Sequence, residues 1–189
     1  MRDAIVPSVH TIATVLDELE ANDRALDELV LGLDAAALSR RPAPARWSPA
    51  EHVEHLNLST EAYLPLVETA AADLRARGVT ARGPLRTDLM GRFLIWMVEP
   101  PVRKRVRTSD RFVPGPAVDP ARVVARFHEL QRALLARVRS FEGLALDRAR
   151  VTSPFDARVR YSAWSALRIL APHQRRHLWL ARRDLARRA

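Results

Sequence analysis

Four long stretches of this sequence repeat apolar residues at intervals of three and four, and this repeat restricts the possible folds more than any other feature. Such spacing places the apolar side chains on one side of an α-helix. The stretches run from residue 8 to about 31, from 48 to about 75, from 119 to about 138 and from about 162 to 185. No alternating pattern is long enough to indicate a sheet. The sequence therefore predicts an all-α protein, an antiparallel four-helix bundle.

Two of these helices begin with a capping residue followed by a proline. Ser48 can cap the second helix, Pro49 occupies the first turn, where its missing N–H costs nothing, and Glu51 completes a capping box. Asp119-Pro120 repeats the device at the third helix.

The segment between the second and third helices is long. A helix near its middle, from about residue 87, is predicted to stop at Pro100-Pro101. We therefore expect a long, partly helical central crossover. No internal repeat or change of composition divides the chain, so one domain is expected over residues 1–189.

The composition is that of an ordinary globular domain. The chain has 189 residues, of which 48% are hydrophobic, and no cysteine. Its longest apolar run, residues 93–98, is much shorter than the roughly 20 residues of a membrane-spanning helix, and the N-terminal residues lack the apolar core of a secretory signal. We expect a cytoplasmic protein with no membrane segment. Without cysteine, sulfur chemistry would require a thiol supplied by a small molecule.

The formal net charge of +9 raises the question of nucleic acid binding, because clustered basic side chains neutralise phosphates. The arginines, however, are spread along the chain among acidic residues, and Lys104 is the only lysine. Two local clusters remain, at residues 103–107 and 182–188, and neither contains interleaved aromatic residues. A solvated basic surface is the favoured interpretation, so nucleic acid is not expected as a partner.

Four of the six histidines form two close pairs, His52 with His55 and His173 with His177. Because His173 and His177 are four residues apart, they lie one turn apart on one side of a helix and can reach a single ion. At about 100° per residue they share the sector of Leu170, whereas Arg175 lies on the opposite side. This pair is predicted to point into the protein.

In the earlier pair, either His52 or His55 could point inwards, and helical position alone does not choose between them. Taken alone, each pair is more typical of an ordinary buried or surface pair than of a metal site. Two inward pairs strengthen the case for a metal, since buried imidazoles need hydrogen-bond partners or an ion to compensate for lost hydration. On these grounds a three-His metal site and ordinary packing are about equally supported.

Other metal architectures are excluded by particular residues. A zinc protease helix needs a glutamate after its first histidine, and this position holds Gln174. A di-iron bundle needs Glu-x-x-His pairs, but the last helix has no acidic residue near His173. Soft-metal and iron–sulfur sites need cysteine.

The run RWSPAEHVEHL at residues 46–56, together with HQRRHL at residues 173–178, resembles the DinB/YfiT-like superfamily, specifically its DinB_2-type members. In that family a Trp-Ser or Trp-Thr begins the second helix, a His-Leu follows eight residues after the tryptophan, and the last helix carries His-x-x-x-His. Trp47 and His55 have this spacing. The resemblance covers essentially the whole chain, including Arg41-Pro42 ahead of Trp47.

The resemblance implies a bundle in up-down-down-up order, often dimeric, in which three histidines hold a divalent metal, here zinc or nickel. Carried over by position, the ligands are His55, His173 and His177, and His52 becomes a neighbour of the site. The chain departs from the family pattern in two places. Leu180 stands where many members have glutamine, and Pro172 is expected to kink the last helix.

Three neutral imidazoles leave a bound ion with an open position, which is typical of a catalytic site. Some DinB-like proteins act as thiol-dependent transferases or isomerases, and a relative is described as a hydrolase. The leading hypothesis is a homodimeric, metal-dependent transferase or hydrolase that activates a low-molecular-weight thiol or water toward a small-molecule substrate. The alternative is a non-catalytic bundle, metal-binding or metal-free, that serves a stress response or binds a partner.

Four side chains are candidates for substrate binding in the mouth of the bundle. For each of them, packing or a surface ion pair is the more common role. They are Glu61, Tyr63, Arg92 and Trp96.

Overall fold

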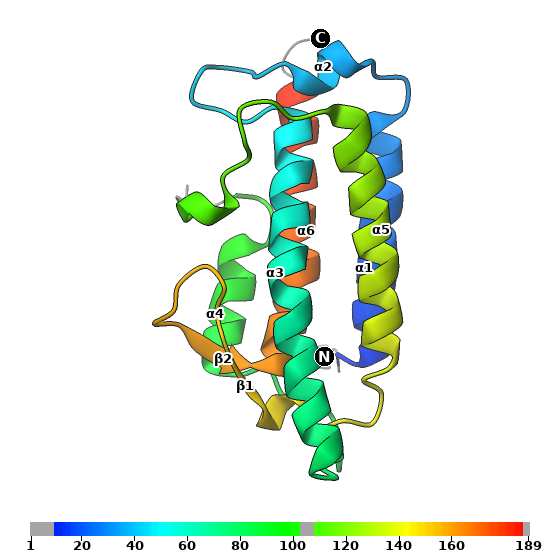
Figure 1. The fold of residues 1–189 in the computed structure, drawn as a ribbon, viewed down its shortest axis with the longest axis vertical. Helices are drawn as coiled ribbons and strands as arrows, with labels where there is room; N and C mark the ends of the chain where they lie inside the picture. The colour runs from blue at the N-terminus through cyan, green and yellow to red at the C-terminus, as the bar shows by residue number, and fades with distance from the viewer. Residues whose placement is uncertain (1–9, 103–107, 187–189) are drawn as a thin grey trace, which may run out of the picture.

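Four long helices dominate the computed structural model, which describes residues 10–102 and 108–186 (Figure 1). They are α1 (Ile12–Val30), α3 (Pro49–Ala76), α5 (Pro120–Arg139) and α6 (Ala163–Ala186). The predicted all-α four-helix bundle is therefore confirmed. The first helix begins later than the periodicity indicated, because Thr11 caps it and its side chain accepts a hydrogen bond from the backbone N–H of Thr14. The predicted start at Ser8 lies outside the described residues.

The four helices have the up-down-down-up order. In Figure 1, α1 and α6 run upward, whereas α3 and α5 run downward. Helix α3 packs against α6 and α5, and α1 packs against the same two helices. The neighbours α3 and α5 are therefore parallel although they are consecutive long helices. A parallel pair requires the chain to return along the whole bundle, which explains the long crossover at residues 77–119.

The crossover contains the helix that the sequence predicted there. This helix is α4 (Leu89–Val98), and a single 3-10 turn, η1 (Asp110–Phe112), follows it. Asp88 caps α4 by accepting from the N–H of Gly91 at 2.8 Å, and its other carboxylate oxygen accepts from the N–H of Ser162 at 2.6 Å. The crossover is thereby attached to the start of α6.

Three short elements were not predicted. They are α2 (Ala35–Ser39) and an antiparallel hairpin of β1 (Arg150–Thr152) and β2 (Arg160–Ser162), in which Val151 lies opposite Tyr161. Strands of three residues are too short for a period of two to be recognised. A further 3-10 turn, η2 (Leu146–Arg148), precedes the hairpin.

The apolar core is divided into two clusters by a layer of polar side chains. One cluster surrounds Trp164 and the other surrounds Phe127. Each long helix contributes at least one buried polar residue, among them Asn22 on α1, His55 on α3, Gln131 on α5 and Gln174 on α6. Buried polar groups of this kind require hydrogen-bond partners or an ion.

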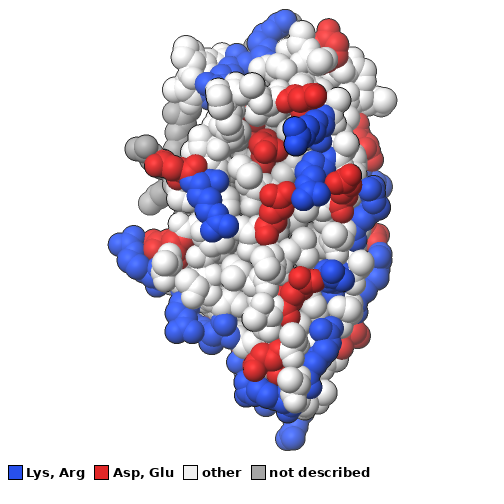
Figure 2. Space-filling model, in the orientation of Figure 1, with Lys and Arg blue, Asp and Glu red and all other residues white. Residues whose placement is uncertain are grey.

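The surface carries mixed charge over the face formed by α3 and α5. Figure 2 shows acidic and basic side chains interleaved there, with basic side chains more numerous toward the lower end. Arg126, for example, pairs with Glu61 at 2.8 Å. Within residues 10–102 and 108–186, no helix combines the length and apolar character needed to cross a membrane.

Helix α4 approaches α6 so closely that only glycine fits at the contact. A Cβ atom added to Gly91 would lie 2.3 Å from the Oγ atom of Ser165. We predict that Gly91→Ala lowers the free energy of unfolding by about 1–3 kcal/mol, although alanine has the higher helix propensity. The measurement is urea denaturation followed by circular dichroism. Gly83→Ala is the matched control, because nothing lies within 4 Å of its added Cβ. Equal stability of the two variants would contradict the close approach.

Candidate metal centre

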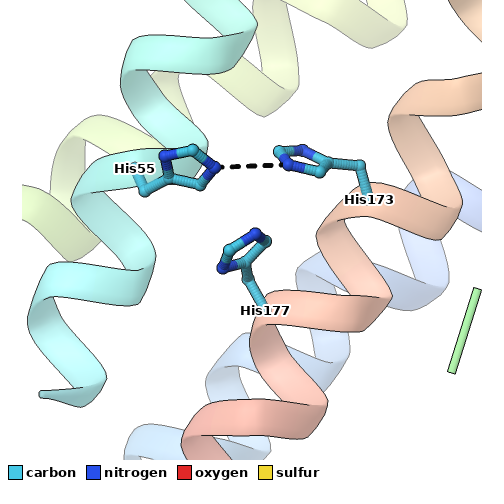
Figure 3. Close-up of side chains that lie close together, drawn as sticks. All are labelled: His55, His173 and His177. Atoms are coloured by element: carbon cyan, nitrogen blue, oxygen red, sulfur yellow. Dashed lines mark hydrogen bonds between the residues drawn. The ribbon is translucent and has the colours of Figure 1, made fainter. Parts of the chain in front are cut away.

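His55, His173 and His177 come together in the interior between α3 and α6. Each offers one ring nitrogen, and these three nitrogens lie within 4.8 Å of one another. Figure 3 shows the three rings turned toward a common space, one from α3 and two from α6. In the part of the chain that the structure describes, no other trio of histidine and acidic side chains is grouped this closely.

The start of α3 fixes the position of its two histidines. The N–H of Glu51 donates to the Oγ atom of Ser48 at 3.2 Å, and the Glu51 carboxylate accepts from the N–H of Ser48 at 2.7 Å. This is the predicted capping box. Arg41 forms an ion pair with the same carboxylate. Burial raises the pKa of Glu51, but the hydrogen bonds from Arg41 and Ser48 outweigh it and hold the pKa below its ordinary value.

His55 has its ring orientation and tautomer set by the crossover. Its Nδ1 atom lies 2.7 Å from the backbone carbonyl oxygen of Phe112 in η1. A carbonyl oxygen only accepts, so Nδ1 carries the proton and donates it. The lone pair of the neutral ring is consequently on Nε2. Hydrogen bonds of this type orient the histidine ligands of metal sites.

The distance between His55 and His173 fits a shared cation. Their Nε2 atoms are 3.3 Å apart. In a tetrahedral site, metal–nitrogen distances of about 2.0–2.1 Å place two ligand nitrogens roughly 3.3–3.4 Å apart. The ring centroid of His177 lies 4.4 Å from that of His55 and 4.8 Å from that of His173. The residues present therefore fit a divalent ion of the zinc class.

His52 lies directly behind His177. Their Nδ1 atoms are 3.0 Å apart, a hydrogen-bond distance. The Nδ1 atom of His177 is thus occupied, and its Nε2 atom is the nitrogen available to the common space. His52 is buried to the same degree as His177, with exposed fractions of 7% and 8%. The expectation that His52 is a neighbour of the site agrees with this contact.

The rotation of α6 is fixed by polar contacts with α1 and α5. The side chain of Asn22 donates to the carbonyl oxygen of Ala171 at 2.9 Å. Gln174 donates to Gln131 at 2.8 Å, and Gln131 donates to the carbonyl oxygen of Leu19 at 2.7 Å. Gln174, the residue that excludes a zinc protease, therefore holds α6 to α1 and α5 while its neighbour His173 faces α3.

The histidines are held in their neutral forms. Burial lowers the pKa of His55 to about 4, against the opposing effect of the Phe112 carbonyl. Burial first, and then the nearby His55, lower the pKa of His52 to about 4. Burial likewise lowers the pKa of His173 and of His177 well below the ordinary value. Neutral imidazole is the form that binds metal ions.

Aromatic side chains surround the histidines. The ring of Trp47 lies 5.0 Å from His55, and the ring of Phe155 lies 5.8 Å from His173. Phe155 also packs against Phe112 at 4.2 Å. These rings exclude water and lower the local dielectric. Phe112 and Phe155 were not predicted, because both lie in or beside irregular segments where no periodicity marks an inward side chain.

The candidate substrate-binding residues lie in different places. Tyr63 is buried two turns after His55, near Phe155, and its hydroxyl lies 2.7 Å from that of Tyr161. Glu61 is engaged with Arg126 on the outer face. Arg92 and Trp96 are exposed on α4. Tyr63 is therefore linked to the site through Phe155, whose ring lies beside His55 and His173.

The two departures from the family pattern leave the site intact. Helix α6 continues through Pro172 to Ala186. Leu180 is half-buried. The kink expected at Pro172 stays a prediction.

Comparison with known proteins agrees with the fold. A sequence profile of the DinB superfamily, DinB_2, matches residues 18–181. The chain belongs to the DinB superfamily. No functionally curated protein matches it.

A solved structure supports the bundle topology of this DinB-superfamily member. YfiT from Bacillus subtilis, described as a probable metal-dependent hydrolase with an unusual four-helix bundle topology, superposes with a TM-score of 0.60 at 17% sequence identity. The match covers 100% of this chain and 91% of YfiT. At this identity the likeness shows the fold alone.

The buried neutral histidines predict a loss of stability in acid. In the unfolded chain a histidine has a pKa of about 6.5, so below that pH the unfolded state binds more protons than the folded state. Stability should therefore fall as the pH decreases from about 6.5 to 4. For His55 alone the loss is about 3 kcal/mol.

Urea denaturation of the metal-free protein in a chelator, repeated across this pH range, measures the effect. His55→Gln should flatten the dependence, and His128→Ala, which changes a half-buried histidine on α5, is the control. Stability that is constant from pH 7 to pH 4 would contradict the buried neutral state.

Proposed function

We propose that this protein is a divalent-metal-dependent enzyme of the DinB superfamily, with His55, His173 and His177 as the metal ligands. The observation that carries the proposal is the convergence of three buried ring nitrogens, two of them separated by the distance that a tetrahedral ion imposes. An ion bound there, zinc or nickel, would lower the pKa of a bound thiol or water and polarise a substrate carbonyl.

The chain's own residues prepare the ligands for this role. The Phe112 carbonyl keeps the Nε2 atom of His55 free of a proton, and burial keeps all three imidazoles neutral. The rings of Trp47 and Phe155 keep solvent away from them. Electrostatic interactions are stronger in such a dry, preorganised site.

The proposed substrate is a small molecule, and the proposed nucleophile is a thiol cofactor or water. The chain has no cysteine, so a thiol would have to come from a low-molecular-weight compound. Tyr63 supports the position of Phe155 over the histidines through its contact with that ring. Burial raises the pKa of Tyr63 well above its ordinary value, so its hydroxyl stays protonated. The homodimer stays a prediction.

One observation also favours a closed, non-catalytic metal site. Phe155 packs against Phe112 and His173, and Trp47 packs against the rings of His52, His55 and His177. Structural sites are enclosed in this way, whereas catalytic sites keep an open position. Turnover measurements separate the two functions.

Metal content tests the ligand assignment. Untagged protein should contain about one divalent ion per chain by elemental analysis, and His55→Ala and His173→Ala should each lose it, because two imidazoles bind such an ion much more weakly than three. His128→Ala is the matched control, since its ring contacts Asp23 at 2.8 Å instead of the site. Metal content that is unchanged in both ligand variants would defeat the assignment.

Turnover tests the enzymatic function. The metal-loaded protein should accelerate the reaction of a low-molecular-weight thiol with an electrophile panel, or hydrolyse members of an ester and amide panel. The acceleration should disappear with a chelator and in His55→Ala, since the nucleophile would then lack the cation. A metal-loaded protein that is inactive across both panels would favour the closed structural site.

A further inference from the structure

His52 and His177 make a contact that the metal-site assignment alone does not require. The Nδ1 atoms of the two rings are 3.0 Å apart, and both side chains are buried. His52 does not belong to the group of His55, His173 and His177, in which one nitrogen of each ring lies within 4.8 Å of a nitrogen of both other rings. His52 touches the site from behind one of its ligands.

The contact contains one proton, and its location decides whether His177 can bind a cation. Each neutral imidazole has one N–H and one lone pair. If His52 donates, the Nδ1 atom of His177 accepts. The single ring proton of His177 is then on Nε2, which faces the other two histidines. Where His177 donates, its Nε2 atom holds the lone pair. Only the second arrangement leaves three lone pairs for an ion.

We propose that His52 is a positioning residue that accepts the Nδ1 proton of His177 and so holds the Nε2 lone pair of that ligand toward the cation. The inference rests on the proposed function. The side chain of His52, on α3, therefore orients His177 in the same way as the Phe112 carbonyl, in the crossover, orients His55. Partners of this kind fix both the tautomer and the ring orientation of metal-binding histidines.

The surroundings of His52 support a fixed role. It lies one turn after Ser48, in the capped start of α3, and its backbone N–H donates to the carbonyl oxygen of Ser48 at 3.0 Å. The edge of its ring meets Trp47 at a centroid distance of 5.5 Å. The ring is held by the helix on one side and by an indole on the other, so its Nδ1 atom stays directed at His177.

Metal affinity tests the proposal in the untagged full chain. Competition with a chromogenic chelator gives the dissociation constant for zinc. His52→Ala should weaken binding about 10- to 100-fold. His52→Asn should recover most of that loss, because the asparagine amide oxygen can accept near the place of Nδ1. His128→Ala should bind as the wild type does. Equal zinc affinity of the wild type and His52→Ala would overturn the proposal.

The tautomer of His177 gives a second readout. If His52 had only a structural role, replacing it would leave this tautomer unchanged. Nitrogen-15 NMR of the metal-free wild type should show the proton of His177 on Nδ1, and His52→Ala should show a mixture of tautomers. A wild-type proton on Nε2 would overturn the proposal without any variant, including the case in which His52→Ala does not fold. A wild type that binds no zinc would instead overturn the proposed function, and the tautomer result would stand separately.

Discussion

The burial of four imidazoles between α3 and α6 is the constraint on which the rest of the structure depends. A polar group taken out of water without a partner costs about 1–3 kcal/mol, so every ring nitrogen in this layer needs a hydrogen bond or an ion. The protein meets this need with a carbonyl for His55 and a second imidazole for His177. The same layer contains the amides of Asn22, Gln131 and Gln174, which satisfy one another and nearby carbonyls. Two separate apolar clusters are the consequence of this layer.

The up-down-down-up order also has a consequence for the site. Because α3 and α5 are parallel, the crossover must travel the length of the bundle, and it passes the histidines on the way. It supplies Phe112 there, and the hairpin before α6 supplies Phe155. An up-down-up-down bundle with short loops would leave these histidines without the carbonyl that orients His55 and without the aromatic cover. The topology and the chemistry of the site are therefore linked.

The sequence predicted the long helices and the side chains that point inward from them, but not the residues that irregular segments bring to the site. Helical periodicity placed His173 and His177 inside, because the direction of a side chain follows from its position on a helix. It could not choose between His52 and His55, and the structure shows why: both are buried, His55 among the three converging rings and His52 behind them. The family pattern, not the periodicity, separated their roles. Phe112 and Phe155 have no regular neighbours from which an inward direction could be derived, and the three-residue strands are shorter than the pattern that identifies a sheet.

The proposed ligands differ in how easily a substitution can change the partner that orients each ring. His55 is oriented by a backbone carbonyl, which no substitution of the Phe112 side chain removes directly. His177 contacts the side chain of His52 instead, so a change at residue 52 alters that contact while leaving all three proposed metal ligands in place. Outer partners of metal ligands influence affinity and the acidity of groups bound to the metal. A bundle with an unchanged three-His pattern can therefore differ in metal affinity through residue 52, one turn before the first ligand, and a comparison restricted to the three ligands would miss the difference.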